Sequence, residues 1–317
     1  MKDLAKKYLL LLIFSIFSLG ASQPNFILVL ADDVGWPHIG PMARYFETKY
    51  PHIPLNSIDS MPPSGYPFTP NLDAMAANGA LFPNSYVTGS TCRPSIAGLL
   101  SGCNDVFNLV QGQHTILPQL LQQVGYATLK TGKWWEGSPK DWGFDESNKD
   151  YGVLDVQIGR KTMEPVYDFI VGAQGRDKPF FIWLAVHIPH SNHNGAPADI
   201  QAYWQARWPK TNGWKYMAMV SWLDRVIGEL NTFLADNGLA QNTLIAFLAD
   251  NGAGLQPSKG SFSEGGLRSP LLLYYPGVIQ AQIREELVSS VDLFPTFLDY
   301  AGLPVPIGCP DRMSLKA

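Results

Sequence analysis

Apolar runs that end in polar residues recur along the chain. They cover residues 25–31, 126–129, 178–186 and 242–249. Uninterrupted apolar segments of this length are typical of strands buried on both faces, as in a parallel sheet covered by helices. We therefore expect these segments to form the core strands of the fold.

Helical patterns lie between these runs. Thr69-Pro70 is a favourable cap and first turn of a helix, and Gly79 is a plausible end for it. Apolar residues at helical spacing predict two more helices, over residues 214–234 and 292–300. The alternation of buried strands and helices predicts an α/β fold with a mainly parallel central sheet. The Pro/Gly-rich stretch 51–70 is expected to be an irregular loop beside the active-site face.

The first residues follow a different pattern. Three lysines precede an apolar run over residues 8–19, and the small residues Gly20, Ala21 and Ser22 follow it. This order is typical of a secretory signal peptide, and the run is shorter than the roughly 20 residues of a membrane span. We therefore predict a signal peptide over residues 1–22, one catalytic domain over residues 23–317, and a secreted, periplasmic or lumenal location. An uncleaved membrane anchor is the alternative.

Composition and charge narrow the function classes. The 317 residues include 46% hydrophobic and 16% charged residues, and the net charge of −4 comes without a long run of either sign. This excludes the basic surface expected of a nucleic-acid-binding or anionic-membrane-binding protein. Three cysteines, Cys92, Cys103 and Cys309, are too few for a disulfide framework, and the odd number leaves at least one thiol unpaired within the chain.

Polar residues follow the predicted strands where those strands end. Because ligands bind outside the carboxyl ends of strands in open α/β sheets, we expect these residues to converge. Carboxylate and amide oxygens favour a hard cation, Ca²⁺ or Mg²⁺, over zinc. The converging residues are Asp32, Asp33, Lys133, His190, Asp250 and Asn251.

Longer segments resemble the sulfatase family over nearly the whole chain after residue 23. They occur in the family's order and are PNFILVLADDVG (24–35), TPNLD (69–73), CRPSIAGLLSG (92–102), GYAT (125–128), TGKW (131–134), PH (189–190), DNG (250–252), KG (259–260), EGGLRSP (264–270), YPG (275–277) and DLFPTFLDYAG (292–302). The resemblance implies an alkaline-phosphatase-like fold, in which a mainly parallel sheet lies between two helical layers. It also implies a sulfuric ester hydrolase acting on a sulfated sugar or an aryl ester.

The resemblance also implies roles for single residues. Cys92 corresponds to the cysteine that a formylglycine-generating enzyme oxidises to formylglycine, whose hydrate attacks sulfur. Lys133, His190 and Lys259 correspond to residues that bind the sulfate oxygens and support departure of the leaving group. The residues that correspond to the family's metal ligands, usually of Ca²⁺, are Asp32, Asp33, Asp250 and Asn251.

The chain departs from the family pattern at three places. Ile96 stands where the family has an arginine, and Trp135 stands where it has a histidine. Arg93 lies close enough in sequence to be a candidate substitute for that arginine. The chain also ends at Ala317, before the family's usual C-terminal subdomain.

These departures leave alternative functions open. One is a sulfatase-fold protein that binds its ligand without catalysis. A second is a phosphate or phosphonate ester hydrolase, although Asn251 after Asp250 favours the single-metal sulfatase type. A third, a cysteine hydrolase with an unmodified Cys92, offers no reason for the metal residues.

Overall fold

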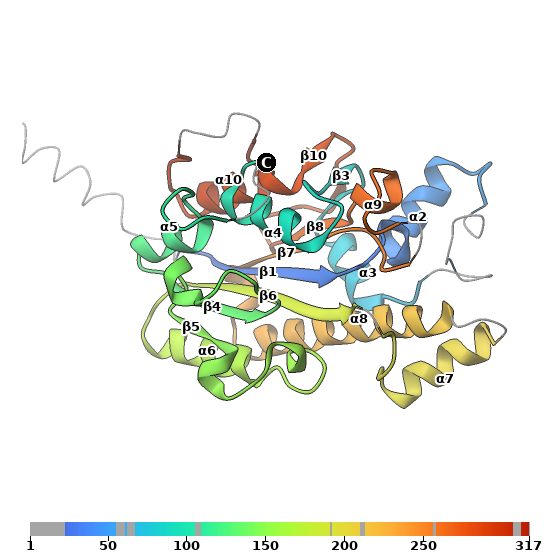
Figure 1. The fold of residues 1–317 in the computed structure, drawn as a ribbon, viewed down its shortest axis with the longest axis horizontal. Coiled ribbons are helices and arrows are strands. Elements are labelled where there is room, and N and C mark those ends of the chain that lie inside the picture. Colours follow the sequence, from blue (N-terminus) through green and yellow to red (C-terminus); the bar gives the residue numbers. More distant parts are fainter. Residues whose placement is uncertain are drawn as a thin grey trace, which may run out of the picture.

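An eight-stranded sheet forms the centre of the molecule (Figure 1). The computed structural model describes residues 23–54, 61, 67–104, 109–190, 192–209, 213–255, 258–306 and 312–316. The strand order is β5-β4-β6-β1-β7-β8-β2-β9, and β10 pairs with β3 in a separate two-stranded sheet. The strands are β1 (Asn25–Asp32), β2 (Ala80–Phe82), β3 (Ser85–Tyr86), β4 (Ala127–Gly132), β5 (Glu146–Ser147), β6 (Phe180–Pro189), β7 (Thr243–Ala249), β8 (Leu271–Tyr274), β9 (Gln282–Ile283) and β10 (Val288–Ser289).

The pairing confirms the predicted mainly parallel sheet. β1 lies between β6 and β7 and is parallel to both, and β4 continues the parallel order beside β6. β8 is antiparallel to β7 and to β2. Each of the four predicted core strands is present, so the carboxyl ends of β1, β4, β6 and β7 lie along one edge of the sheet.

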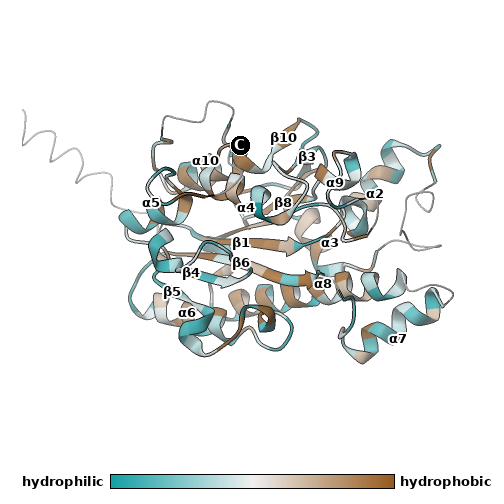
Figure 2. Cartoon of the chain, in the orientation of Figure 1, coloured by the Kyte–Doolittle hydropathy of each residue, from teal (hydrophilic) through white to brown (hydrophobic). Residues whose placement is uncertain are grey.

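Helices cover both faces of this sheet (Figure 1). In β1, Phe26, Leu28 and Leu30 join one buried apolar cluster, and the alternate residues Ile27 and Val29 join the other. The first cluster packs against α4, α5 and α10, and the second packs against α2, α3, α6, α7 and α8. Figure 2 shows the resulting pattern, with hydrophobic central strands and more hydrophilic outer helix surfaces. The two clusters confirm the predicted α/β architecture.

The predicted helices are present with small shifts of their ends. The helix expected after Thr69 ends at Ala77, and the one expected over residues 214–234 spans Gly213–Asp236. Sequence pattern alone missed the other six helices that the described residues form, α2, α4, α5, α6, α7 and α9. The helices are α2 (Gly40–Lys49), α3 (Pro70–Ala77), α4 (Cys92–Ser101), α5 (Leu117–Gln123), α6 (Glu164–Gly175), α7 (Ala198–Arg207), α8 (Gly213–Asp236), α9 (Glu264–Leu267) and α10 (Leu293–Tyr300).

Several sequence predictions concern the two ends of the chain, the cysteines and the expected loop. The predicted signal peptide, Cys309 and Ala317 lie outside the described residues, as do residues 55–60 and 62–66 of the expected loop. Cys103 is disulfide-bonded, whereas Cys92 is a free, buried thiol. Within the described part of the chain, no helix has both the length and the apolar character needed to cross a membrane.

Candidate active site at the carboxyl ends of the strands

The residues that the sequence analysis selected lie together at the edge where the parallel strands end. Asp32 is the last residue of β1, and Asp33 follows it. Cys92 is the first residue of α4. Lys133, His190 and Asp250-Asn251 directly follow β4, β6 and β7, and Lys259 lies in the loop after β7.

The backbone after β1 turns sharply to present Asp33. Asp33 has a φ of 69°, which is uncommon for a residue with a side chain. Tyr216 of α8 braces this turn, because its hydroxyl accepts a hydrogen bond from the Gly35 N–H at 3.0 Å and donates one to the Asp33 carbonyl at 3.1 Å. Sequence analysis missed Tyr216, since nothing in a helical apolar pattern marks one tyrosine as a contact to a distant loop.

Two lysines neutralise part of a dense group of carboxylates. Lys133 donates hydrogen bonds to Asp32 and, at 3.1 Å, to Asp250. Lys259 Nζ lies 2.5 Å from Asp33 Oδ1. Burial lowers the pKa of Lys133, but the two carboxylates outweigh this effect and shift it upward overall. Both lysines are therefore held as cations beside the acidic group.

Cys92 lies between these charges. Its Sγ is 3.1 Å from Lys259 Nζ and 3.9 Å from Asp32 Oδ1. Burial, reinforced by the negative charge of Asp250, raises the pKa of the Cys92 thiol to about 12. An unmodified Cys92 is thus a protonated thiol at neutral pH, which is a poor nucleophile. This environment opposes the reading of the site as a cysteine hydrolase.

The acidic group fits a divalent cation. Ligand atoms of Asp32, Asp33, Cys92 and Asp250 all lie within 4.8 Å of one another. Among the described residues, the buried oxygens Asp32 Oδ2 and Asn251 Oδ1 accept no hydrogen bond. Burial and the neighbouring Asp250 raise the pKa of Asp32 well above its usual value, as expected when carboxylates crowd together without a cation. Oxygen donors of this kind suit Ca²⁺ or Mg²⁺.

Two histidines border the carboxylates. His190 Nε2 lies 4.0 Å from Asp33 Oδ2, and His187 Nδ1 lies 3.6 Å from Asp32 Oδ2. The sequence analysis selected only His190. Arg160 supports both residues from outside the cluster, because its guanidinium donates hydrogen bonds to the carbonyls of His187, at 3.0 and 2.5 Å, and of His190, at 3.4 Å.

The two departures from the family motifs have different surroundings. Ile96 is 3% exposed and packs in the apolar cluster beneath α4, so an apolar side chain occupies the place of the family's arginine. Arg93 does not replace the arginine, because it forms hydrogen bonds of 2.9 and 3.1 Å with the carboxylate of Glu136. Trp135 remains 42% exposed, and Lys133 Nζ lies 4.9 Å from its ring centre.

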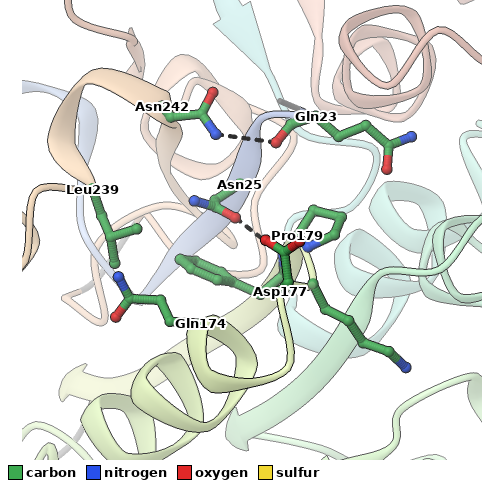
Figure 3. A pocket seen from close by; sticks show the side chains of 9 residues that line it. Gln23, Asn25, Gln174, Asp177, Pro179, Leu239 and Asn242 are labelled. Atoms are coloured by element: carbon green, nitrogen blue, oxygen red, sulfur yellow. Dashed lines mark hydrogen bonds between the residues drawn. The ribbon is translucent and has the colours of Figure 1, made fainter. Parts of the chain in front are cut away.

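A separate pocket lies at the opposite edge of the sheet, where β1 and β6 begin (Figure 3). It has a volume of about 480 Å³ and is lined by polar residues that include Gln23, Asn25 and Asn242. Asn242 donates a hydrogen bond to the Gln23 carbonyl, and the Asn25 side chain accepts one from Phe180 N–H. The pocket contains none of the selected site residues, so it is separate from the candidate site at the carboxyl edge.

The fold and this edge define a protein of the alkaline-phosphatase-like class, with an acidic group suited to a cation beside a helix that begins at a cysteine. A sequence model of the Sulfatase family matches residues 24–303. The chain therefore belongs to the sulfatase family, as its motifs predict.

Relatives with known names agree with this assignment. The chain is 29% identical to N-acetylgalactosamine-6-sulfatase of Canis lupus familiaris, over 94% of this chain and 66% of that protein. It is also 29% identical to human arylsulfatase A, over 90% of this chain and 66% of that protein. The chain thus spans just under two thirds of the length of these relatives.

Solved structures share the fold. The crystal structure of Ps i-CgsB in complex with k-i-k-neocarrahexaose is 26% identical, with a TM-score of 0.70 over 90% of this chain and 73% of that one. The PsFucS1 sulfatase from Pseudoalteromonas sp. is 23% identical, with a TM-score of 0.68 over 90% of this chain and 69% of that one. The second likeness supports the fold alone.

Proposed function

We propose that this protein hydrolyses sulfate esters of carbohydrates, with formylglycine at position 92 and one divalent cation, Ca²⁺ by preference. The observation that carries the proposal is the meeting of Cys92, two lysines and a crowded group of carboxylates at one sheet edge. In the net reaction, water adds across the S–O bond, so that the alcohol receives hydrogen and the sulfate receives hydroxyl.

The charges in the site suit this substrate. Asp32, Asp33 and Asp250 bring three negative charges, and Lys133 and Lys259 bring two positive ones. A divalent cation held by the carboxylates and Asn251 would leave one net positive charge, which matches the single negative charge of a sulfate monoester. A bound cation of this kind stabilises charge on the oxygens around sulfur.

Each side chain has a task in this proposal. The hydrate of formylglycine supplies the attacking oxygen and later releases sulfate as the aldehyde reforms. Lys259 and Lys133 stabilise the charge that grows on the sulfate oxygens, because both ammonium groups are fixed before the reaction begins. His190 donates a proton to the departing alcohol oxygen. Arg160 holds the backbone on which His190 lies.

Substrate class and location belong to the same proposal. Ps i-CgsB, the structural relative that is 26% identical, was crystallised in complex with k-i-k-neocarrahexaose, which favours a sugar ester over a simple aryl ester. The charge and apolar pattern of residues 1–22 favours export, to the exterior, the periplasm or an organelle lumen. Maturation then requires a formylglycine-generating enzyme.

The proposal is tested by sulfate release from N-acetylgalactosamine 6-sulfate, with protein produced beside a formylglycine-generating enzyme. We expect release that falls by on the order of 10³-fold or more in Cys92→Ala protein, because the nucleophile is gone. Equal release by the two proteins would overturn the mechanism.

Ile96 and Trp135 favour a second function, ligand binding without catalysis. Buried Ile96 replaces the arginine that the family has beside the nucleophile. Arg93 does not substitute for it, because its guanidinium is paired with Glu136. This function predicts that the ester binds but that no sulfate is released, even from protein whose residue 92 is aldehyde. Release above that of a metal-stripped control would rule it out. Nothing in the site favours a phosphate or phosphonate ester.

A further inference from the structure

An exposed indole lies beside the sulfate-binding lysine. Lys133 Nζ lies over the Trp135 ring, 4.9 Å from its centre, while the same ammonium group donates hydrogen bonds to Asp32 and Asp250. Lys133 is 4% exposed and Trp135 is 42% exposed. The indole therefore borders the buried charge on its inner side and keeps a large accessible surface.

The loop that carries Trp135 is fixed on both sides. The neighbouring Trp134 packs edge-on against Phe144 and donates a hydrogen bond to the Gly137 carbonyl at 3.0 Å. On the other side, Glu136 is paired through both carboxylate oxygens with Arg93 in the first turn of α4. The Arg93–Glu136 pair thus ties the indole to the helix that begins at Cys92.

The position of the ring relative to the reacting group follows from these contacts. Asp32 Oδ1, which accepts a hydrogen bond from Lys133, lies 3.9 Å from Cys92 Sγ. A sulfate group held between residue 92 and Lys133 would therefore lie beside the indole. The exposed indole surface would then be within reach of the next atoms of the substrate, on the far side of the ester oxygen.

We propose that Trp135 is a stacking platform for the sugar ring that carries the sulfate, and so a specificity-determining residue of this enzyme. This inference rests on the proposed function and deepens it. Aromatic side chains bind the apolar face of a ring through a large, rigid contact surface, whereas histidine offers less area and a polar edge. Trp135 therefore exchanges a polar contact near the nucleophile for a contact with the ring.

The test distinguishes a contact with the sugar ring from a contact with the sulfate group. Binding is measured by isothermal titration calorimetry in Cys92→Ala protein loaded with Ca²⁺, so that turnover does not interfere. The two probes are N-acetylgalactosamine 6-sulfate, which has a ring, and ethyl sulfate, which has none. Trp135→Ala is expected to weaken binding of the sugar ester by roughly three- to tenfold and to leave ethyl sulfate unchanged. Trp135→Phe is expected to restore most of the loss.

Two controls keep the result interpretable. Val171→Ala removes another exposed apolar side chain, 52% exposed on α6, and is expected to change neither affinity. Melting temperatures show whether each variant is folded.

The other outcomes contradict the platform in distinguishable ways. If Trp135→Ala weakened the binding of both probes equally, Trp135 would act only by positioning Lys133. If it weakened the binding of neither, the indole would not contact the sugar ring. Absence of binding of either ester to the Cys92→Ala protein would overturn the proposed function itself, and the platform with it.

Discussion

Lys133 and Lys259 differ in how the chain holds them. Lys133 has two carboxylate partners and lies directly after β4, whereas Lys259 lies in a loop and bridges Asp33 and Cys92. Lys259 Nζ lies within hydrogen-bond distance of the Cys92 sulfur, at 3.1 Å. Its ammonium group is fixed without help from substrate, which is the condition for effective charge stabilisation.

Replacement of Lys259 by alanine removes this ammonium group from the site. Lys259→Ala should lower kcat by on the order of 10²- to 10³-fold, because one fixed donor to the sulfate oxygens is lost. Lys316→Ala, at a lysine paired with Asp299 at 3.3 Å far along the chain, serves as the control. Steady-state kinetics on the sugar ester measures both variants, and a loss below about threefold for Lys259→Ala would contradict its assigned role.

Gly132 sets the position of Lys133. It has a φ of 71°, and a Cβ there would lie 1.8 Å from the Ala185 carbonyl oxygen. Gly137, in the same loop, has a φ of 74° but open space around it. The two glycines therefore share a positive φ and differ in whether a Cβ would meet the neighbouring backbone.

This pair allows a matched experiment. Gly137→Ala should lower the free energy of unfolding by about 1 kcal/mol, from backbone conformation alone. Gly132→Ala should lower it by at least about 2 kcal/mol more, because the strand backbone must also move. Urea denaturation measures both, and equal losses would show that the contact with Ala185 is relieved easily.

At the residue scale the sequence predicts which side chains meet but not what supports them. Asp32, Lys133 and Asp250 are recognisable because polar residues end apolar runs, and strand order then brings them together. Arg160 and Tyr216 support the site through hydrogen bonds to backbone groups of residues distant in sequence. Such contacts leave no pattern in the amino-acid sequence.

At the element scale, α3 depends on a cap from another helix. Its second and third residues donate backbone hydrogen bonds to the Asp224 carboxylate of α8, at 3.1 and 2.8 Å. The Asn71 side chain donates to the same carboxylate at 2.8 Å. One buried aspartate thus satisfies donors that every helix start leaves unpaired.

Removal of this carboxylate should destabilise the protein. Asp224→Ala is expected to lower the free energy of unfolding by about 1–3 kcal/mol, because buried N–H groups lose their acceptor. Asp236→Ala, at the end of the same helix, should change it by less than about 0.5 kcal/mol. Chemical denaturation of the three proteins tests this, and similar values for the two variants would contradict the cap.

Asp224 also predicts a pH dependence of stability. Burial, only partly offset by the backbone hydrogen bonds from Leu72 and Asn71, raises the pKa of Asp224 from 3.8 to about 6, and Asp73 adds to the increase. The folded state therefore binds this proton more tightly than the unfolded state. The contribution of the protonated carboxyl to the free energy of unfolding is fully present below about pH 4 and is lost as pH rises through about 6. It amounts to up to about 3 kcal/mol.

The comparison is with Asp224→Asn, which keeps the size of the side chain and one acceptor oxygen but does not titrate. The difference in unfolding free energy between wild type and variant should shift against the wild type from pH 4 to pH 7. A difference that stays constant with pH would show that Asp224 keeps its ordinary pKa in the folded protein.

The core strands are the part of the fold that the sequence predicts best. β1, β6 and β7 are buried on both faces, so their apolar runs are unbroken and easy to recognise. β8 and β2 are short, and α7 has only two buried residues, Ile200 and Trp204. Their structure depends on neighbours that a local pattern does not contain.

At the scale of the whole molecule, the proposed cation would link the site to the stability of the fold. The carboxylates that would hold it lie at the ends of β1 and β7, and Lys133 and Lys259 offset only part of the repulsion among them. A ligand that binds only the folded state stabilises it, by about 2.7 kcal/mol at 100 times its Kd.

Chelation should therefore lower the melting temperature and abolish sulfate release, and Ca²⁺ should restore both. Asp250→Ala protein should show no such response, because a ligand is missing. Differential scanning calorimetry with EDTA, Ca²⁺ or Mg²⁺ makes the comparison. A melting temperature that is unchanged by EDTA and by Ca²⁺ would contradict the cation site.

The chemical state of residue 92 tests the central claim most directly. Mass spectrometry of the peptide that contains Cys92, from protein of the native source, distinguishes thiol from aldehyde, and an aldehyde-reactive probe provides an independent check. We predict formylglycine at this position despite Ile96, and its absence in a Cys92→Ala control. An intact thiol in all of the protein would contradict the catalytic account and favour ligand binding alone.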